Sequence, residues 1–415
     1  MSSLGSPNPF FIAGKKAYEV ERSLRFNDDD GASLTRTQST SPTNSKKGTL
    51  SFWVKRGNLG NSQHFYNAYA DNNNRGIIYF RSDVNALQIG NQSGGSFYSI
   101  IRLNRLFRDS SAWYHIVIGF DTTQGTAADR IKVYVNGSQE TSFHTSNYPS
   151  QNDDIVFFNR ANVKIGAAHD NQANEYFDGY TTEFNYIDGT ALTPSSFGET
   201  NTETGQWIPK RPSVTYGTNG FRLNFSDNSG TTATTLGKDS SGNGNNFTPN
   251  NFSVAAGAGN DSVEDTPTNN FPTFNPLCEN NDHTYLEGNL KVTHFANNQS
   301  GSTTSMATPR TGKWYWEVRA LDSFLFIGVT ADTYLGTGNV ISATNTGGST
   351  VAYYNDGQKY VGGSASGYGA SFANGDLIGV AVDMDNGQVT FYKNNASQGA
   401  ISLISTRGHI GVGAV

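Results

Sequence analysis

The residue types that perform catalysis are present in this chain, but none stands in a familiar catalytic spacing. The seven histidines are scattered, and the sequence contains no G-x-S-x-G, H-E-x-x-H or P-loop motif. A nucleophile or an acid–base pair needs partners that are held in fixed geometry. We therefore expect a protein that is not an enzyme. His115 lies in a stretch that alternates apolar and polar residues, which predicts either a histidine on the sheet surface or a satisfied core histidine.

Paired carboxylates would indicate glycoside hydrolysis, because glycosidases place two acidic residues around the scissile bond. The strand patterns E-x-D-x-E and E-x-D-x-x-E do not occur in the sequence. Glu19 and Glu21 precede the first expected strand, and Glu199 and Glu203 fall in an irregular stretch. A polysaccharide-degrading activity is therefore the least favoured function.

Two oxygen-rich segments have the chemistry that calcium prefers, since calcium takes carboxylate and carbonyl oxygens in a flexible cage. They are NDDDG (27–31) and AHDNQAN (168–174). Ordinary acidic turns have the same composition, so the metal is unknown, and calcium is the one cofactor that the sequence leaves open. DMDNG (383–387) opens like a calcium loop, but its Asn-Gly pair predicts a hairpin turn and we assign it no metal.

Three segments combine aromatic residues with Asn, Asp and Gln, which is the chemistry of sugar recognition. They are HFYNAYADNNNR (64–75), FHTSNYPSQNDD (143–154) and AYYNDGQKY (352–360). Polar decoration of surface loops would give the same composition. These segments are the candidates for binding a glycan.

The composition predicts an all-β protein with many turns. Charged residues make up 15%, whereas Gly, Phe and Tyr supply 46, 26 and 20 positions. Aromatic residues suit strands, and glycine suits the turns between strands. The net charge of −6 gives no electrostatic footprint for nucleic acid, so we expect no nucleic-acid partner.

The single cysteine, Cys278, excludes a disulfide framework within the chain and indicates a protein made in a reducing cytoplasm. We expect Cys278 to be a small, partly buried apolar residue. The start, MSSLGSPNPFFIAGKK, does not resemble a signal peptide. No stretch approaches the roughly 18 apolar residues of a membrane helix, so we expect no membrane insertion.

Patterns along the chain predict two β-sandwich, jelly-roll-like domains joined by an irregular, turn-rich segment. Residues 1–20 form an N-terminal arm that is either disordered or docks on a neighbouring subunit. In residues 191–300, Trp207, Phe247 and Phe252 recur in a tract rich in Asn, Ser and Gly, which predicts an ordered extension around the first domain followed by a connector. The two sandwiches are expected at 21–190 and 301–415, where period-two strands dominate.

WYHIVIGFD (113–121) followed by IKVYVNG (131–137) resembles the central hairpin of laminin-G-like, concanavalin-type domains. FDGYTTEFNYIDG (177–189) resembles the last core strand of that family. Phe184 and Tyr186 share one face of this strand, which we expect to be the core face. Phe177 has the opposite parity, so it needs a bulge or packs elsewhere, and Gly179 is the expected position of a bulge or of a close backbone approach.

A second resemblance, to the SPRY domain, covers about 100 residues at the end of the sequence. It rests on GKWYWEV (312–318), FLFIGVT (324–330) and GDLIGVAVDMDNGQVTFYKN (375–394). The family usually continues beyond the point where this sequence ends, so we expect either a short last strand or a sandwich that is incomplete at its C-terminus. SPRY domains bind partners through variable loops, and the resemblance implies ligand-binding roles for Tyr353, Tyr354, Asp356 and Tyr360.

FGETNTETGQWIPK (197–210) and GKDSSGNGNNFTPNNFS (237–253) resemble segments of bacteriophage structural proteins. The resemblance implies a virion surface protein that is made in the host cytoplasm and acts as a tail fibre, spike or capsid decoration. Other virion proteins, further copies of the chain and a host surface glycan are the expected partners. The alternatives are a glycan-binding module of a cellular adhesin and, last, a polysaccharide-degrading tailspike. The sequence leaves open the position on the particle, the oligomeric state and the ligand.

Overall fold

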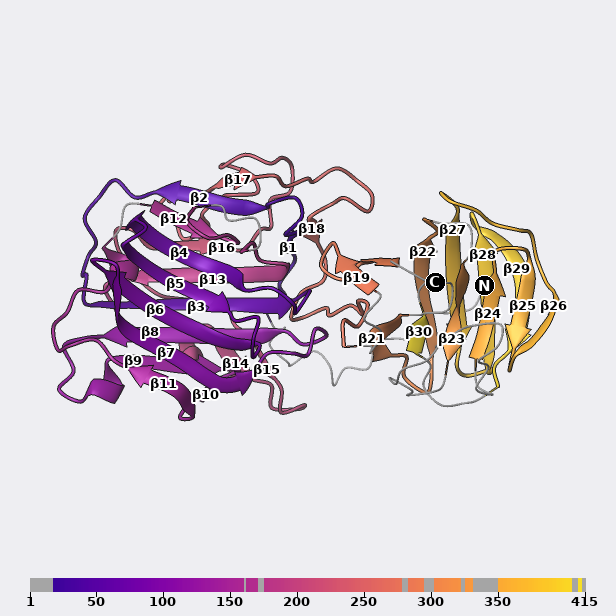
Figure 1. Cartoon of the computed structure of the whole chain (residues 1–415), viewed down its shortest axis with the longest axis horizontal. Helices are drawn as coiled ribbons and strands as arrows, with labels where there is room; N and C mark the ends of the chain where they lie inside the picture. The colour runs from indigo at the N-terminus through magenta and orange to yellow at the C-terminus, as the bar shows by residue number, and fades with distance from the viewer. Residues whose placement is uncertain are drawn as a thin grey trace, which may run out of the picture.

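The computed structural model describes residues 18–159, 162–170, 175–277, 283–294, 302–321, 325–330, 350–404 and 410–412. Within these residues the regular elements are strands and three short 3-10 helices, η2 (Ala127–Asp129), η3 (Val156–Phe158) and η4 (Pro194–Ser196). The all-β prediction is thus confirmed. Figure 1 shows two lobes with a connecting segment between them. The expected arm lies outside the described residues apart from residues 18–20, and Cys278 lies outside them too.

The first lobe is a sandwich of two large antiparallel sheets. Sheet A has the order β10 (Ser138–Gln139), β9 (Ile131–Val135), β8 (Tyr114–Asp121), β3 (Lys47–Arg56), β13 (Gly179–Asp188), β1 (Ser23–Phe26) and β18 (Ser262–Val263), and β16 (Phe221–Leu223) also pairs with β13. Sheet B has the order β11 (Phe143–Asn147), β7 (Ser96–Leu106), β6 (Ala86–Ser93), β5 (Asn74–Phe80), β4 (Gln63–Asp71), β12 (Asn162–Ile165), β2 (Ser33–Thr37) and β17 (Thr248–Asn250).

Alternating apolar positions of the two sheets fill the space between them, as the period-two pattern predicts. Leu50, Phe52 and Val54 of β3 are fully buried in this core. The intervening residues of β3 are buried as well, because segments from outside the sandwich cover the outer face of sheet A. Trp53 and Lys55 are therefore covered by other parts of the protein and shielded from solvent.

The last core strand, β13, contains a bulge, but the bulge does not lie at the position expected from the sequence. Phe184 and Tyr186 lie in the core as expected, and so does Phe177. The register between β13 and β3 shifts between Thr182 and Asn185, where Glu183 has a φ of 49°. The extra residue at Glu183 reverses the parity, so the bulge is there and not at Gly179. Gly179 instead allows a close approach, since a Cβ there would lie 2.3 Å from the carbonyl oxygen of Lys55.

The extension after residue 190 wraps the first lobe, as its aromatic anchors predict. It contains β14 (Gly198–Thr200), which pairs with β15 (Trp207–Pro209), and it supplies β16, β17 and β18 to the two large sheets. Phe247 is fully buried in the sandwich core, and Phe252 packs against that core. The extension is therefore part of the first domain, and the connector follows it with the hairpin β19 (His283–Leu286) and β20 (Lys291–His294).

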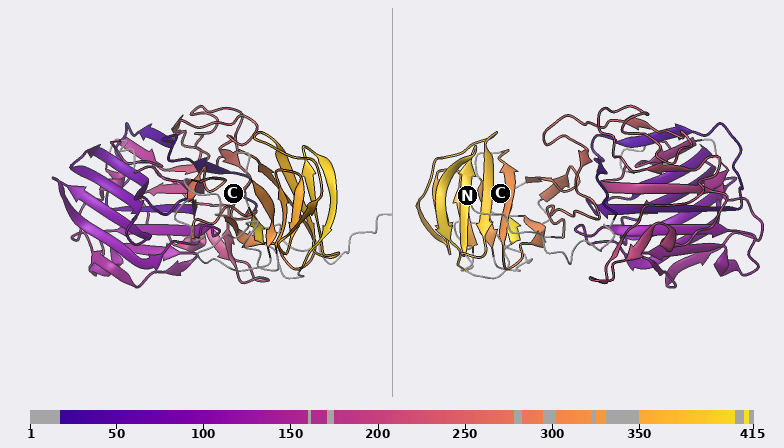
Figure 2. Two further views of the ribbon diagram at one scale, coloured as in Figure 1. Left: turned by 45° about the vertical axis from the view of Figure 1, so that its right-hand side comes forward. Right: turned by 180° about the vertical axis from the view of Figure 1, so that it is seen from behind.

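The second lobe contains a six-stranded and a four-stranded sheet. The six-stranded sheet has the order β21 (Thr303–Ala307), β30 (Ile410–Val412), β23 (Phe326–Thr330), β24 (Thr350–Tyr354), β25 (Gln358–Val361) and β26 (Ser364–Gly367). The four-stranded sheet has the order β22 (Lys313–Arg319), β27 (Leu377–Asp383), β28 (Gln388–Lys393) and β29 (Ala396–Ser402). The hairpin expected at Asn386-Gly387 joins β27 to β28. Figure 2 shows this lobe and the connector from two further sides.

Candidate functional site

His115 is the histidine that a catalytic hypothesis would use first, and the structure places it in a closed stack. The indole Nε1 of Trp207 donates to Nδ1 of His115 at 2.9 Å, and Nε2 lies 2.9 Å from Oγ of Ser51. Because Nδ1 accepts this hydrogen bond, the ring proton is on Nε2 and points at Ser51. Burial lowers the pKa of His115 to about 3. The ring has no free lone pair toward the serine, and of the two expected placements His115 has that of a satisfied, buried histidine.

The four residues for which the SPRY resemblance implied ligand-binding roles do not lie on one surface. Tyr353 is fully buried in the core of the second lobe, where its ring centroid lies 4.9 Å from that of Phe372. Its hydroxyl donates to the carbonyl of Ala370. Tyr353 is therefore a core residue, and its expected role as a ligand contact is wrong for this arrangement. It lies on β24, where alternate residues face opposite sides of the sheet.

Tyr354 and Tyr360 come together on the outer face of the six-stranded sheet. Both rings contact Phe326, with centroid distances of 4.2 Å from Tyr354 and 4.9 Å from Tyr360. All three rings are half-buried, and we call them the aromatic cluster. Asp356 lies in the turn after Tyr354, where its carboxylate accepts from the backbone N–H and the side-chain amide of Gln358. Nothing in the sequence marked Phe326 as a functional residue, because only the pairing of β23 with β24 places it beside Tyr354.

The first candidate calcium segment, residues 27–31, places the carboxyl group of Asp28 near the buried carboxyl group of Asp178. Asn58 donates from Nδ2 to Asp28 at 2.8 Å and from its backbone N–H to Asp178 at 3.3 Å. Burial raises the pKa of both carboxyls, and that of Asp178, which also faces Asp28, is raised well above its usual range. One proton shared by the two carboxyls accounts for this arrangement. Among the described residues, no group of three or more His, Cys, Asp and Glu is placed to hold a metal ion.

The outer face of sheet B carries several side chains of the types that bind sugars. Register places residues of β4, β5, β6 and β7 in three rows that cross the strands. The first row is His64, Tyr79, Gln88 and Arg102, the second is Asn67, Ile77, Gly90 and Ile100, and the third is Tyr69, Arg75, Gln92 and Phe97. We call these residues the polar–aromatic face. The segment 64–75, expected as a loop, supplies β4 and the start of β5.

Hydrogen bonds hold the third row and the second calcium segment in one network. Arg75 donates from Nε to Gln92 at 2.8 Å and from Nη1 to Nδ1 of His169 at 2.9 Å. Because the guanidinium can only donate, Nδ1 of His169 accepts, and Nε2–H donates to Asn72 at 2.7 Å. Burial, with the charge of Arg75, lowers the pKa of His169 and keeps its ring neutral. The structure thus joins segments 64–75 and 168–170, which the sequence treated as separate sites.

The first row is held in a similar way. The rings of His64 and Tyr79 stack with centroids 5.0 Å apart, and Gln88 donates to the hydroxyl of Tyr79 at 2.8 Å. Burial lowers the pKa of His64 to about 4, so this ring is also neutral at physiological pH.

Several large side chains of the polar–aromatic face remain half-buried and can meet a ligand. They are Tyr69, Arg75, Tyr79, Phe97, Ile100 and Arg102. The ring of Phe97 lies over Gly90, where a Cβ would come within 2.7 Å of it, so glycine permits this placement. Fixed aromatic faces beside hydrogen-bonding amide and guanidinium groups are suited to the apolar faces and hydroxyls of sugars. The other predicted segment, 143–154, supplies β11 at the edge of the same sheet.

Comparison with known families agrees with this architecture. Residues 26–196 match the model of the Concanavalin A-like lectin/glucanases superfamily, and residues 313–404 match the model of the SPRY domain. The chain contains a concanavalin-like domain followed by a SPRY domain. Both domain resemblances expected from the sequence are therefore confirmed. No curated protein matches the chain.

Solved structures that match the chain share little sequence with it. A heptameric SAP-like pentraxin from Limulus polyphemus is 22% identical over 43% of this chain and 80% of its own, with a TM-score of 0.31. The mouse laminin alpha1 domains LG4-5 are 9% identical over 99% of this chain and 86% of their own, with a TM-score of 0.32. A human SPRY domain is 19% identical over 32% of this chain and 85% of its own, with a TM-score of 0.25.

Among the described residues, no helix has the length and apolar character that crossing a membrane would require.

Proposed function

We propose that the chain is a non-catalytic protein that attaches to surface glycans through the polar–aromatic face of its concanavalin-like domain. The observation that carries the proposal is the fixed arrangement of half-buried Tyr79, Phe97 and Arg75 on one open sheet face. The match to a family of lectins and glucanases supports the same conclusion. The stack around His115 supports a binding role over catalysis, because the residues that could resemble a nucleophile and base satisfy each other.

A glycan array tests the proposal. The chain is expected to bind a subset of bacterial surface glycans, and Tyr79→Ala should weaken that binding by about tenfold, the effect of losing one aromatic stacking contact of roughly 1.4 kcal/mol. Lys132→Ala is the matched control, since Lys132 lies on β9 of the opposite sheet and is partly exposed. A folded wild-type chain that binds no glycan would count against the proposal.

We further propose that this binding serves a bacteriophage particle, on which the chain is a tail fibre, spike or capsid decoration. The support is the resemblance of segments 197–210 and 237–253 to phage structural proteins. Several copies on one particle would convert weak single sites into useful avidity. Antibody labelling of purified virions is the test: label at the tail tip supports host attachment, and label spread over the capsid supports decoration. Particles without label would contradict a virion role.

A further inference from the structure

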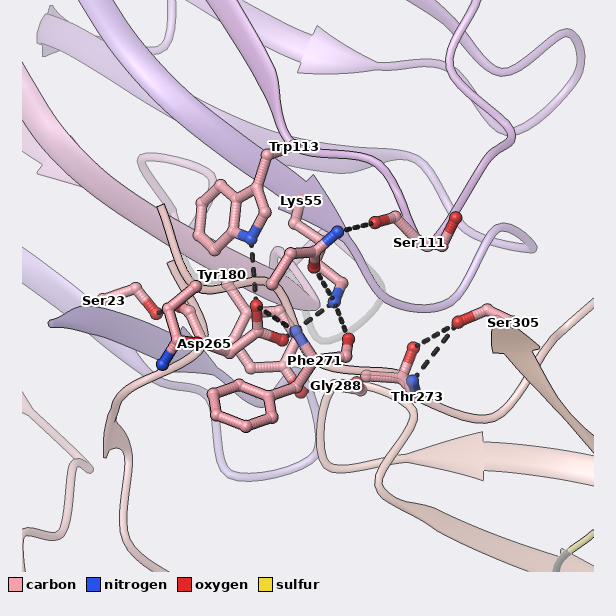
Figure 3. Close-up of polar contacts among 12 residues, drawn as sticks. Ser23, Lys55, Ser111, Trp113, Tyr180, Asp265, Phe271, Thr273, Gly288 and Ser305 are labelled. Atoms are coloured by element: carbon pink, nitrogen blue, oxygen red, sulfur yellow. Dashed lines mark hydrogen bonds and ion pairs between the residues drawn. The ribbon is translucent and has the colours of Figure 1, made fainter. Parts of the chain in front are cut away.

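The two lobes are joined by a segment that is bonded to both of them, as Figure 3 shows. We call residues 261–277 and 283–290 the coupling segment. Its central residue is Asp265, which accepts hydrogen bonds from the indole Nε1 of Trp113 at 3.0 Å and from Nζ of Lys55 at 2.8 Å. The backbone carbonyl of Asp265 accepts from the hydroxyl of Ser23 at 2.5 Å. Three strands of sheet A or their ends therefore hold this one residue.

Lys55 is the partner that fixes the geometry. Its ammonium is fully buried and lies 2.8 Å from Asp265, 2.9 Å from Oδ1 of Asn270 and 2.7 Å from the carbonyl of Phe271. All three protons of the ammonium are thus donated to the coupling segment. A buried ion whose partners are all satisfied is costly to separate, because either charge alone would remain without water.

Only one residue separates this attachment from the attachment to the second lobe. Phe271 is bonded to Lys55, and Thr273 accepts through its carbonyl from the backbone N–H of Ser305 at 2.7 Å. Ser305 belongs to β21, which pairs with β30 in the six-stranded sheet. The residue between the two anchors is Pro272, whose ring fixes φ.

A second part of the coupling segment is also bonded to sheet A and is bonded to the first part of the segment. The hydroxyl of Tyr180 donates to the carbonyl of Gly288 at 2.7 Å, and Arg25 forms an ion pair with Glu287 at 3.0 Å. The next residue, Asn289, accepts through its carbonyl from the backbone N–H of Phe274. The two parts of the segment are therefore bonded to each other as well as to sheet A.

We propose that the coupling segment is a rigid joint that holds the concanavalin-like and SPRY domains in one fixed orientation, with the buried Lys55–Asp265 pair as its lock. The polar–aromatic face and the aromatic cluster then move as one body. A surface that carries ligands for both would meet them at a set spacing. The rigidity itself stands independently of glycan binding, so it can be tested without a ligand.

Small-angle X-ray scattering and limited proteolysis of the full chain test the joint. We expect the wild-type scattering to fit a single conformation. In Asp265→Asn the curve should require an ensemble, and cleavage within the coupling segment should become about tenfold faster, as expected for a locally opened segment. Glu140→Gln is the control, because it breaks an ion pair between a largely buried carboxylate and the exposed Arg105 elsewhere in the first lobe.

Wild-type scattering that itself requires an ensemble would overturn the rigid joint. A folded Asp265→Asn chain that scatters like wild type would overturn the role of the ion pair. If Asp265→Asn fails to fold, the double variant Lys55→Met/Asp265→Leu replaces it, since apolar pairs often substitute for buried ion pairs without loss of folding. The double variant removes the same hydrogen bonds and is judged by the same two outcomes.

Discussion

The indole of Trp207 donates a hydrogen bond to Nδ1 of His115 at 2.9 Å and lies between two glycines. A Cβ at Gly137 or at Gly198 would come within 2.6 Å of the indole ring, so both positions allow its close packing. Trp207 belongs to the extension, and His115 belongs to sheet A. This contact explains why a turn-rich tract after residue 190 is ordered against the first sandwich.

Trp207→Phe should destabilise the first lobe. The variant keeps an aromatic ring but leaves Nδ1 of the buried His115 without a donor, which costs on the order of 1–3 kcal/mol. Urea denaturation followed by intrinsic fluorescence measures the change. Trp314→Phe is the control, because Trp314 is 40% exposed on β22 and its loss should change stability little. Equal effects of the two substitutions would contradict the assigned role of Trp207.

Because Asp178 is buried and its pKa is raised, we expect part of the folding stability to be lost as pH rises. Its pKa in the folded protein lies above the unfolded value, so the proton that it holds stabilises the fold at low pH, and this contribution is lost as pH rises through the folded pKa. Asp178→Asn should therefore become progressively more stable relative to wild type as pH rises above the unfolded pKa of about 3.9. The free energy of unfolding in urea at several pH values measures this difference. A difference that does not change with pH would contradict the shared proton.

We expect His64 and His115 to make the folding stability change with pH in the opposite direction. Their pKa values are lowered to about 4 and about 3, below the unfolded value, so their contribution is complete above the unfolded pKa near 6.5 and is lost as pH falls toward the folded values. Nuclear magnetic resonance of the ring nitrogens should show both rings neutral at pH 6, and His115 protonated on Nε2. A ring that titrates near pH 6.5 would contradict its burial.

We expect Glu183, the residue at the bulge, and Arg222 to be strongly coupled in their effects on stability. Glu183 accepts two hydrogen bonds from Arg222, at 2.8 and 3.0 Å, and both side chains are more than nine-tenths buried. Arg222→Met should cost about 3–5 kcal/mol, because it leaves a buried carboxylate unpaired. Adding Glu183→Gln should recover part of this loss.

A double-mutant cycle by urea denaturation measures the coupling between Glu183 and Arg222. The matched surface pair is Lys132–Asp129, for which Lys132→Ala should cost less than about 1 kcal/mol. Additive effects at Glu183 and Arg222 would show that the bulge does not depend on their ion pair.

Period-two patterns in the sequence predict much of the core. Leu50, Phe52 and Val54 alternate, and they are buried where the pattern placed them. The same pattern could not locate the bulge in β13, because a bulge depends on the register with β3. It also could not tell which side of β24 faces inward, and the SPRY resemblance that implied a ligand-binding role for Tyr353 did not distinguish the two faces of this strand.

The candidate site depends still more on long-range register. Composition singled out segments 64–75 and 168–174, but nothing local indicated that Arg75 bonds to His169. Gln88, Phe97 and Arg102 join the polar–aromatic face only because β6 and β7 lie beside β5 in sheet B. Their own segments alternate like ordinary strands, so they carry no separate functional signal. Phage origin stays a prediction, since it rests on sequence resemblance alone.

The most direct measurement of the central claim is the equilibrium affinity of the full chain for the glycan that an array selects. Titration calorimetry should give saturable binding by wild type and by Lys132→Ala, and binding about tenfold or more weaker by Phe97→Ala, whose ring lies over Gly90 in the middle of the polar–aromatic face. Affinity that is unchanged in Phe97→Ala and in Tyr79→Ala would contradict the account, because binding would then occur elsewhere on the molecule.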